Sequence, residues 1–323
     1  MRYETLGAAG PRVPALILGC GNFGGIGSPA EFRGRGDSRD AAFAVMDAAR
    51  ESALRTFDTA NAYAGGDSER WIGEWLASRN AYDEIAVTTK VGGPVEAGRG
   101  LSRDHIRGQI DASLGRLGVE RVELYLAHGP DDSVPIEETI GAFDELVRAG
   151  KIGAYGISNV DAAQLAAATA AGSPVNVQNG YNLFDRLAQA DVLRACAEQG
   201  VGFTAYSPLA GGLLTGKHRA GEPYRAGTRM ALRPPELTDL TVDQAFAALP
   251  KLTEIADGHG VSLTTLALAW VLTDPGVTAA LVGPRSAEHL RPLVAAVELE
   301  LTAGQRAEIE ATLGDPVAHP RQI

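Results

Sequence analysis

The sequence predicts an α/β fold, a (β/α)8 TIM barrel that forms a single domain over residues 1–323. Short apolar runs alternate with helical segments eight times along the chain, and neither a linker nor a change of composition separates them. Near-continuous apolar strands are typical of a parallel sheet that is covered by helices. Eight such βα units in one uninterrupted series favour a closed barrel with its helices outside.

The predicted strands are short and largely apolar, and they cover residues 15–20, 54–59, 84–91, 122–128, 152–158, 174–181, 201–209 and 277–283. Helices are expected between and after them, at residues 38–52, 68–79, 102–118, 135–150, 161–171, 187–200, 241–273, 286–297 and 302–313. Ser102 is the expected N-cap of the third helix and Gly118 its end. Pro135 and Gly150 similarly bound the fourth helix.

A doubly wound open sheet is the alternative fold, because it also alternates strands with helices. That fold binds a dinucleotide through a glycine-rich turn that leads directly into a helix. The first strand here ends in "LGCGNFGG", but a polar, glycine-rich loop (Gly24–Ser38) follows it. We therefore interpret Gly21 and its neighbours as room for the backbone to approach a ligand. We expect the loop to lie on the substrate side of the site and to shape specificity.

Composition excludes several classes of protein. The net charge is −11, the sequence pI is near 5.1, and Lys and Arg form no basic tract. Nucleic acid and anionic membranes are therefore not expected as partners. Two cysteines far apart suit a reducing cytoplasm better than a disulfide framework. The first residues contain no apolar signal segment, and no apolar stretch approaches the roughly 18 residues of a membrane span.

Polar side chains gather at the predicted C-terminal ends of the strands, where barrel enzymes carry their sites. The second strand ends at Asp58, with Tyr63 in the loop beyond it, and the next two strands end at Lys90 and His128. Each of these residues alone has an ordinary structural explanation. Four ionisable types at three neighbouring strand ends favour a catalytic set. Later strands end in Ser158, Asn159, Gln178, Asn179, Tyr206, Ser207, Gly283 and Arg285.

Elementary acid–base chemistry connects the four residues. A tyrosine phenol titrates near pH 10, and a lysine within about 4–6 Å typically lowers that pKa by one to three units. Lys90 lies in an apolar strand and needs an anion, which Asp58 can supply. We expect Lys90 to lower the pKa of Tyr63, and His128 to orient a substrate oxygen or relay a proton. The set lacks an electron donor, so a reduction would need a hydride from a cofactor.

Several stretches resemble the aldo-keto reductase superfamily: "FDTANAY", "VTTKV", "DASLGRLGVERVELYLAH", "GKIGAYGISN", "VQNGYN" and "TAYSPLAGGLLTGK". The resemblance runs from "LGAAGPRVPALILG" to "VGPRSAEHL", nearly the whole chain. It implies NAD(P)H-dependent interconversion of carbonyls and alcohols on a (β/α)8 barrel. It also implies that Tyr63 is the general acid/base, with Asp58, Lys90 and His128 as its companions.

The resemblance further implies a set of cofactor-binding residues. The nicotinamide carboxamide would be held by Ser158, Asn159 and Gln178, and the ring of Tyr206 would stack on the nicotinamide. The pyrophosphate and the adenosine end would be contacted by Ser207, Leu209, Gly211, Gly283 and Arg285. The expected set is completed by Gly21, Asn22, Pro208, Arg229 and His289.

We expect NADP(H) in preference to NAD(H), mainly because of Arg285. The segment "VGPRSAEHL" ends the eighth strand and begins a predicted helix, whose free N–H groups favour a phosphate. The guanidinium is planar and always charged, and Ser286 can cap the helix or donate to a phosphate oxygen. Arg229, in the long loop after the seventh strand, can add a second charge. NAD(H) remains an alternative cofactor.

Three positions depart from the pattern of the superfamily. Gly180 in "QNGYN" stands where the family usually carries an acidic residue, which would alter hydrogen bonding around Gln178. His289 and Leu293 stand where relatives commonly have Gln and Asn against the adenine. The departures at His289 and Leu293 weaken the expected adenine contacts and leave the phosphate contact more decisive.

Two other functions share parts of this pattern. Some members resemble channel-associated subunits that hold a cofactor and sense redox state, and they keep the same four residues. A metal-dependent hydrolase would need clustered ligands, but the six histidines include no H-x-H pair at a strand end, so no metal is predicted. The expected substrate is a small aldehyde, ketone or aldose, or the matching alcohol. The sequence indicates neither the physiological substrate, nor the direction of reaction, nor the oligomeric state.

Overall fold

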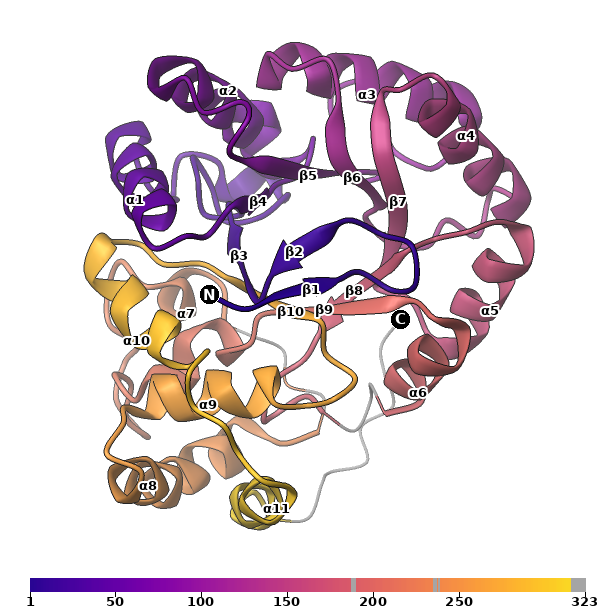
Figure 1. The fold of residues 1–323 in the computed structure, drawn as a ribbon. Helices are drawn as coiled ribbons and strands as arrows, with labels where there is room; N and C mark the ends of the chain where they lie inside the picture. Colours follow the sequence, from indigo (N-terminus) through magenta and orange to yellow (C-terminus); the bar gives the residue numbers. More distant parts are fainter. Residues whose placement is uncertain (187–189, 235–236, 238, 315–323) are drawn as a thin grey trace.

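The computed structural model describes residues 1–186, 190–234, 237 and 239–314. Eight parallel strands close into a barrel in the order β10-β3-β4-β5-β6-β7-β8-β9, with helices around them (Figure 1), which confirms the predicted fold class. All eight predicted strands are present. Their bounds are β3 (Leu16–Gly19), β4 (Thr56–Asp58), β5 (Ala86–Val91), β6 (Val122–Ala127), β7 (Ile152–Ser158), β8 (Asn176–Gly180), β9 (Gly202–Tyr206) and β10 (Ala279–Val282).

An antiparallel hairpin that the sequence did not predict closes one end of the barrel (Figure 1). It consists of β1 (Tyr3–Thr5) and β2 (Arg12–Pro14). Its residues Leu6 and Val13 pack in one apolar cluster with Leu124 and Leu281 of the barrel strands. The turn of the hairpin is tied to the start of β9, because the N–H of Ala8 donates to Gly200 O at 2.8 Å. A ligand therefore has to enter from the opposite end.

The helices of the described residues largely follow the predicted segments. The α-helices are α1 (Arg39–Glu51), α2 (Asp67–Arg79), α3 (Arg103–Leu117), α4 (Ile136–Arg148), α5 (Ala162–Ala171), α6 (Ala190–Gln199), α7 (Arg229–Leu232), α8 (Val242–Gly258), α9 (Leu263–Leu272), α10 (Leu290–Ala295) and α11 (Ala303–Ala311). Short 3-10 helices are η1 (Ala30–Phe32), η2 (Tyr63–Gly66), η4 (Ala210–Thr215) and η5 (Ala287–His289). The predicted start of the sixth helix, residues 187–189, lies outside the described residues.

One helical prediction is confirmed and another needs correction. The segment 241–273 contains more than one helix, as predicted, and α9 begins after Ser262, whose hydroxyl accepts from Thr265 N at 3.1 Å. Ser102 precedes α3 but its side chain makes no capping hydrogen bond. The carboxylate of Glu138, in α4, accepts a hydrogen bond from the first N–H of α3 instead, at 3.0 Å from Arg103 N. Gly118 ends α3 in a left-handed conformation (φ 68°), as predicted.

The main core lies between the barrel and its helices, and every residue of α9 except Thr264 is buried. An apolar helix of this kind is typical of a protein core. Within the described ranges, no single helix is long and apolar enough to cross a membrane. Helices α8 and α9 meet that criterion only as a pair, and the pair is bent by 86°.

Candidate active site

A pocket of about 1110 Å³ opens at the C-terminal ends of the strands, opposite the hairpin. Its volume suits a large cofactor together with a small substrate. Nearly all of the expected site residues line it. They are Gly21, Asn22, Asp58, Tyr63, His128, Ser158, Asn159, Gln178, Tyr206, Ser207, Pro208, Leu209, Gly211, Arg229, Gly283, Arg285 and His289. Lys90 is buried behind this lining.

Lys90 and Asp58 form a buried ion pair at the floor of the pocket. Lys90 also donates to Thr59 O at 2.8 Å, and the second oxygen of Asp58 accepts from Gln178 Nε2 at 2.9 Å. Burial alone would lower the pKa of Lys90, but the charge of Asp58, together with Tyr63 and the hydrogen bonds to both, outweighs burial and raises that pKa. The lysine is therefore a cation at neutral pH, as the sequence predicted.

A tight turn places Tyr63 above this pair. Ala64, Gly65 and Gly66 take left-handed conformations (φ 49°, 69° and 95°), and at two of these three positions the residue is glycine, which adopts them without strain. The Nζ of Lys90 consequently lies 5.2 Å from the centre of the Tyr63 ring. The expected lowering of the phenol pKa is wrong for this structure. Burial raises the pKa of Tyr63, and the charge of Lys90 offsets only part of that, so the phenol is protonated at neutral pH.

His128 lies beside Tyr63, with the two ring centres 5.5 Å apart and the planes near perpendicular at 76°. Burial, reinforced by the charge of Lys90, lowers the pKa of His128 to about 3. The imidazole is therefore neutral and can donate through only one of its nitrogens. Its buried Nδ1 has no hydrogen-bond partner among the described residues.

The residues expected at the nicotinamide are hydrogen-bonded to one another. Ser158 Oγ donates to Gln178 O at 2.6 Å. Tyr206 Oη donates to Asn159 Oδ1 at 2.7 Å. A Cβ at Gly180 would lie 3.3 Å from the Tyr206 ring. The absence of a side chain at Gly180 thus makes room for this tyrosine.

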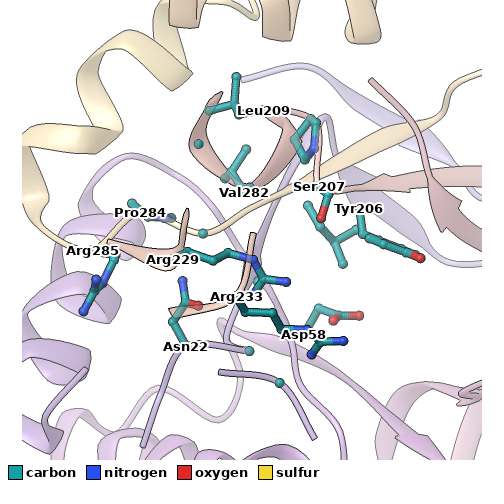
Figure 2. Close-up of a pocket in the computed structure, with 18 of the residues that line it drawn as sticks. Asn22, Asp58, Tyr206, Ser207, Leu209, Arg229, Arg233, Val282, Pro284 and Arg285 are labelled. Carbon is teal, nitrogen blue, oxygen red and sulfur yellow. The ribbon is translucent and has the colours of Figure 1, made fainter. Parts of the chain in front are cut away.

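The far end of the pocket carries Arg285, which Figure 2 shows well away from Tyr206. A helical segment follows Ser286 as predicted, but its first turn is the 3-10 turn η5, and the α-helix α10 begins only at Leu290. Ser286 makes no capping bond, and the N–H of Arg285 donates to His289 Nδ1 at 3.2 Å. The Arg285 guanidinium donates to Asp37 Oδ1 at 2.6 Å and to Gly227 O.

Sequence reasoning missed several pocket residues, among them Asp37, Lys217, Arg225 and Arg233. Lys217 could have been found from the sequence, because it is a cation in an acidic chain and the last residue of "TAYSPLAGGLLTGK", one of the stretches that resemble the superfamily. The Gly24–Ser38 loop was expected only on the substrate side of the site, but its residues line the pocket both near Tyr63 and near Arg285. Ser28 and Pro29 line the pocket, and neighbouring Gly27 accepts from Ala64 N at 3.4 Å beside Tyr63. Asp37 places the loop at the far end as well.

The pocket fits a nicotinamide dinucleotide in shape and charge. Cationic Lys217, Arg225 and Arg285 line it and can neutralise phosphates. Gly211 and Gly212 of η4 have φ of 65° and 104°, where any side chain would be strained. The backbone can therefore approach a ligand closely at this point. The described part of the chain contains no group of three or more His, Cys, Asp or Glu side chains that could hold a metal ion.

Comparison with known proteins agrees with this geometry. Residues 15–313 match the Aldo/keto reductase family. The protein belongs to the aldo/keto reductase family. It is 36% identical over 319 residues to an uncharacterized oxidoreductase, YrpG, of Bacillus subtilis, covering 93% of this chain and 92% of the relative. It is 32% identical over 336 residues to an L-glyceraldehyde 3-phosphate reductase of Escherichia coli, covering 98% and 93%.

A third relative is named as a channel subunit and not as an oxidoreductase. The present protein is 31% identical over 311 residues to this probable voltage-gated potassium channel subunit beta of Arabidopsis thaliana, and the match covers 93% of this chain and 92% of the relative. Family membership and the names of its relatives support an oxidoreductase. Members of the family act on small-molecule carbonyl substrates and generally use NAD(P)H.

Proposed function

We propose that this protein is an NADP(H)-dependent oxidoreductase that interconverts carbonyls and alcohols, with Tyr63 as the general acid/base. One observation carries the proposal. A buried Lys90–Asp58 pair lies under a protonated Tyr63 and a neutral His128, in a pocket that fits a nicotinamide dinucleotide. Aldehydes, ketones and aldoses are the proposed substrates, and the cytoplasm, which keeps both free cysteines reduced, is the proposed location.

Each of the four residues has a separate task in this proposal. When bound, the nicotinamide supplies or accepts the hydride. Tyr63 holds a proton at neutral pH and gives it to the carbonyl oxygen during reduction. Lys90 stabilises the phenolate that remains, because a cation beside a phenolate favours the charged form. Neutral His128 donates a hydrogen bond that orients the substrate oxygen, and Asp58 keeps Lys90 charged and in place.

The preference for NADP(H) rests on the cations at the far end of the pocket. Arg285 and Lys217 are the groups proposed to favour the additional phosphate, because charge-assisted hydrogen bonds to phosphate are strong. Arg229 lies in the middle of the pocket (Figure 2) and is proposed to contact the cofactor from across the opening. The proposed contacts of Ser158, Asn159 and Gln178 would replace some of the mutual hydrogen bonds described above.

Turnover measurements test the proposal. NADPH and NADH oxidation would be followed separately with a panel of small aldehydes, ketones and aldoses. A phosphorylated aldehyde belongs in the panel, because one relative is named for such a substrate and because Arg229 and Arg233 line the pocket. Tight NADPH binding without turnover of any carbonyl would instead favour a cofactor-holding, redox-sensing protein of the same fold.

A further inference from the structure

The end of the pocket that holds Arg285 carries more positive charge than the rest of the molecule suggests. The chain has a net charge of −11, yet Lys217, Arg225 and Arg285 all line this end. Burial lowers the pKa of Lys217, and the charges of Arg285 and Arg225 lower it further. Repulsion between like charges that line one pocket favours an anionic ligand.

A single carboxylate, Asp37, interrupts this cationic cluster. Asp37 lines the same pocket but is only 7% exposed. Its Oδ1 accepts from Arg285 Nε at 2.6 Å, across 248 positions of sequence. Its Oδ2 is buried and has no hydrogen-bond partner among the described residues. One carboxylate oxygen of Asp37 thus accepts from Arg285, and no described residue donates to the other.

The backbone of the Gly24–Ser38 loop fixes Asp37 in this position. Asp37 N donates to Asn22 O at 2.7 Å, and Asp37 O accepts from Gly24 N at 3.1 Å. Gly36 packs so closely that an added Cβ would lie 2.1 Å from Gly25 O. The next residue, Ser38, caps α1 by accepting from Ala41 N at 3.3 Å. Asp37 is therefore held in place on both sides of its Cα.

NADP(H) and NAD(H) differ at one position of the adenosine ribose, and the Asp37–Arg285 pair could distinguish them there. NADP(H) carries a phosphate on the adenosine 2′-oxygen, where NAD(H) carries a neutral hydroxyl. In the dinucleotide sites of doubly wound α/β folds, a carboxylate accepts from that hydroxyl and favours NAD, whereas an arginine accommodates the phosphate. This chain has both determinants in direct contact. A like charge close to a ligand anion also discriminates against that ligand.

We propose that Asp37 is a specificity-determining residue for the nucleotide, because its carboxylate competes with the 2′-phosphate for Arg285. Asp37 then weakens NADP(H) binding and makes NAD(H) a better alternative than the cations alone would allow. This inference rests on the proposed use of NADP(H), with the adenosine end at Arg285. It assigns Arg285 a resting partner that the phosphate has to displace.

The test measures the binding of each nucleotide to the whole protein by fluorescence titration, without any substrate. Asp37→Asn keeps the shape of the side chain and an acceptor for Arg285 but removes the charge. NADPH should bind about tenfold more tightly, which corresponds to about 1.4 kcal/mol. NADH binding should stay within about twofold or weaken. The matched control is Asp40→Asn, which removes an exposed charge three positions further along the chain and should change neither affinity.

A double substitution tests whether the effect passes through Arg285. On an Arg285→Ala background, Asp37→Asn should tighten NADPH binding clearly less than it does in the parent, because little competition remains. If Asp37→Asn does not fold, Asp37→Ser removes the same charge from a smaller side chain and carries the same expectation. Thermal unfolding of each variant shows whether it is folded, and only folded variants enter the comparison of nucleotide affinities.

The outcomes separate this inference from the function on which it rests. A parent that prefers NADPH, together with an Asp37→Asn variant of unchanged or weaker NADPH affinity, overturns the role of Asp37 and leaves NADP(H) use intact. A parent that binds neither nucleotide overturns both. A variant that gains NADPH affinity, while Asp40→Asn does not, supports the inference.

Discussion

Lys90 and Asp58 form an ion pair whose two side chains are only 1% and 3% exposed. Additional hydrogen bonds satisfy both partners, since Thr59 O accepts from the lysine and Gln178 donates to the aspartate. The pair therefore connects β4, β5 and β8 across the floor of the barrel. Removing one member of such a pair leaves an uncompensated charge in the interior, which is strongly destabilising.

Lys90→Met should remove most turnover and also lower the free energy of unfolding by about 3–5 kcal/mol. Turnover falls because the phenolate of Tyr63 loses its cation, and stability falls because Asp58 stays buried without a partner. Any rate-linked pKa of Tyr63 should rise in the variant. Urea denaturation and a pH–rate profile measure the two effects, and a profile identical to that of the parent would contradict the coupling.

Lys151→Met is the matched control, because Lys151 also forms an ion pair, with Asp111, but on the surface. Exposed pairs contribute about 0–1 kcal/mol. Its unfolding curve and turnover should therefore remain close to those of the parent.

The barrel could be predicted because each strand is a local pattern of apolar residues and each helix follows it at close range. Those patterns placed Asp58, Lys90 and His128 at strand ends, and closure of the barrel brings strand ends together. The hairpin β1–β2 was missed because its strands are short and, unlike the equally short β4, are not buried apolar runs. Segments so short are stabilised by packing against the barrel, which a local pattern does not report.

The raised pKa of Tyr63 could not be predicted from residue types. Its direction depends on whether burial or the charge of Lys90 dominates, and only the three-dimensional surroundings decide that. The Asp37–Arg285 contact was missed for a similar reason. The two residues are 248 positions apart, and Asp37 alone resembles an ordinary loop acid before a helix.

Tyr63→Phe should lower kcat by about 10²- to 10⁴-fold, the usual contribution of general acid catalysis. The substitution removes one hydroxyl and keeps the ring against His128, so fold and nucleotide affinity should persist. Tyr82→Phe, which changes an exposed tyrosine, is the control. Near-normal kcat on several carbonyls would mean that another group supplies the proton.

Arg285→Ala should weaken NADPH binding about tenfold to a hundredfold, because a charge-assisted hydrogen bond is worth about 1.5–3 kcal/mol. Binding of NADH should hardly change, since it has no phosphate at that position. Dissociation constants for both nucleotides check this, and equal losses for the two would refute the assignment.

His128 should make the protein less stable in mild acid. Its pKa is about 3 in the folded chain, against about 6.5 when unfolded, so between these values the unfolded state binds one more proton. Stability therefore rises with pH across that window and gains nothing further from His128 above it. The slope from this residue is at most about 1.4 kcal/mol per pH unit.

His128→Gln should flatten this acid dependence, because glutamine does not titrate. Urea midpoints at several pH values between about 4 and 7.5 measure the slope for parent and variant. His259→Gln, at the C-cap of α8 and away from the pocket, is the matched control and should retain the slope of the parent. Parallel curves for parent and His128→Gln would show that His128 takes up its proton in the folded state, and the neutral imidazole assigned to the pocket would then have to be abandoned.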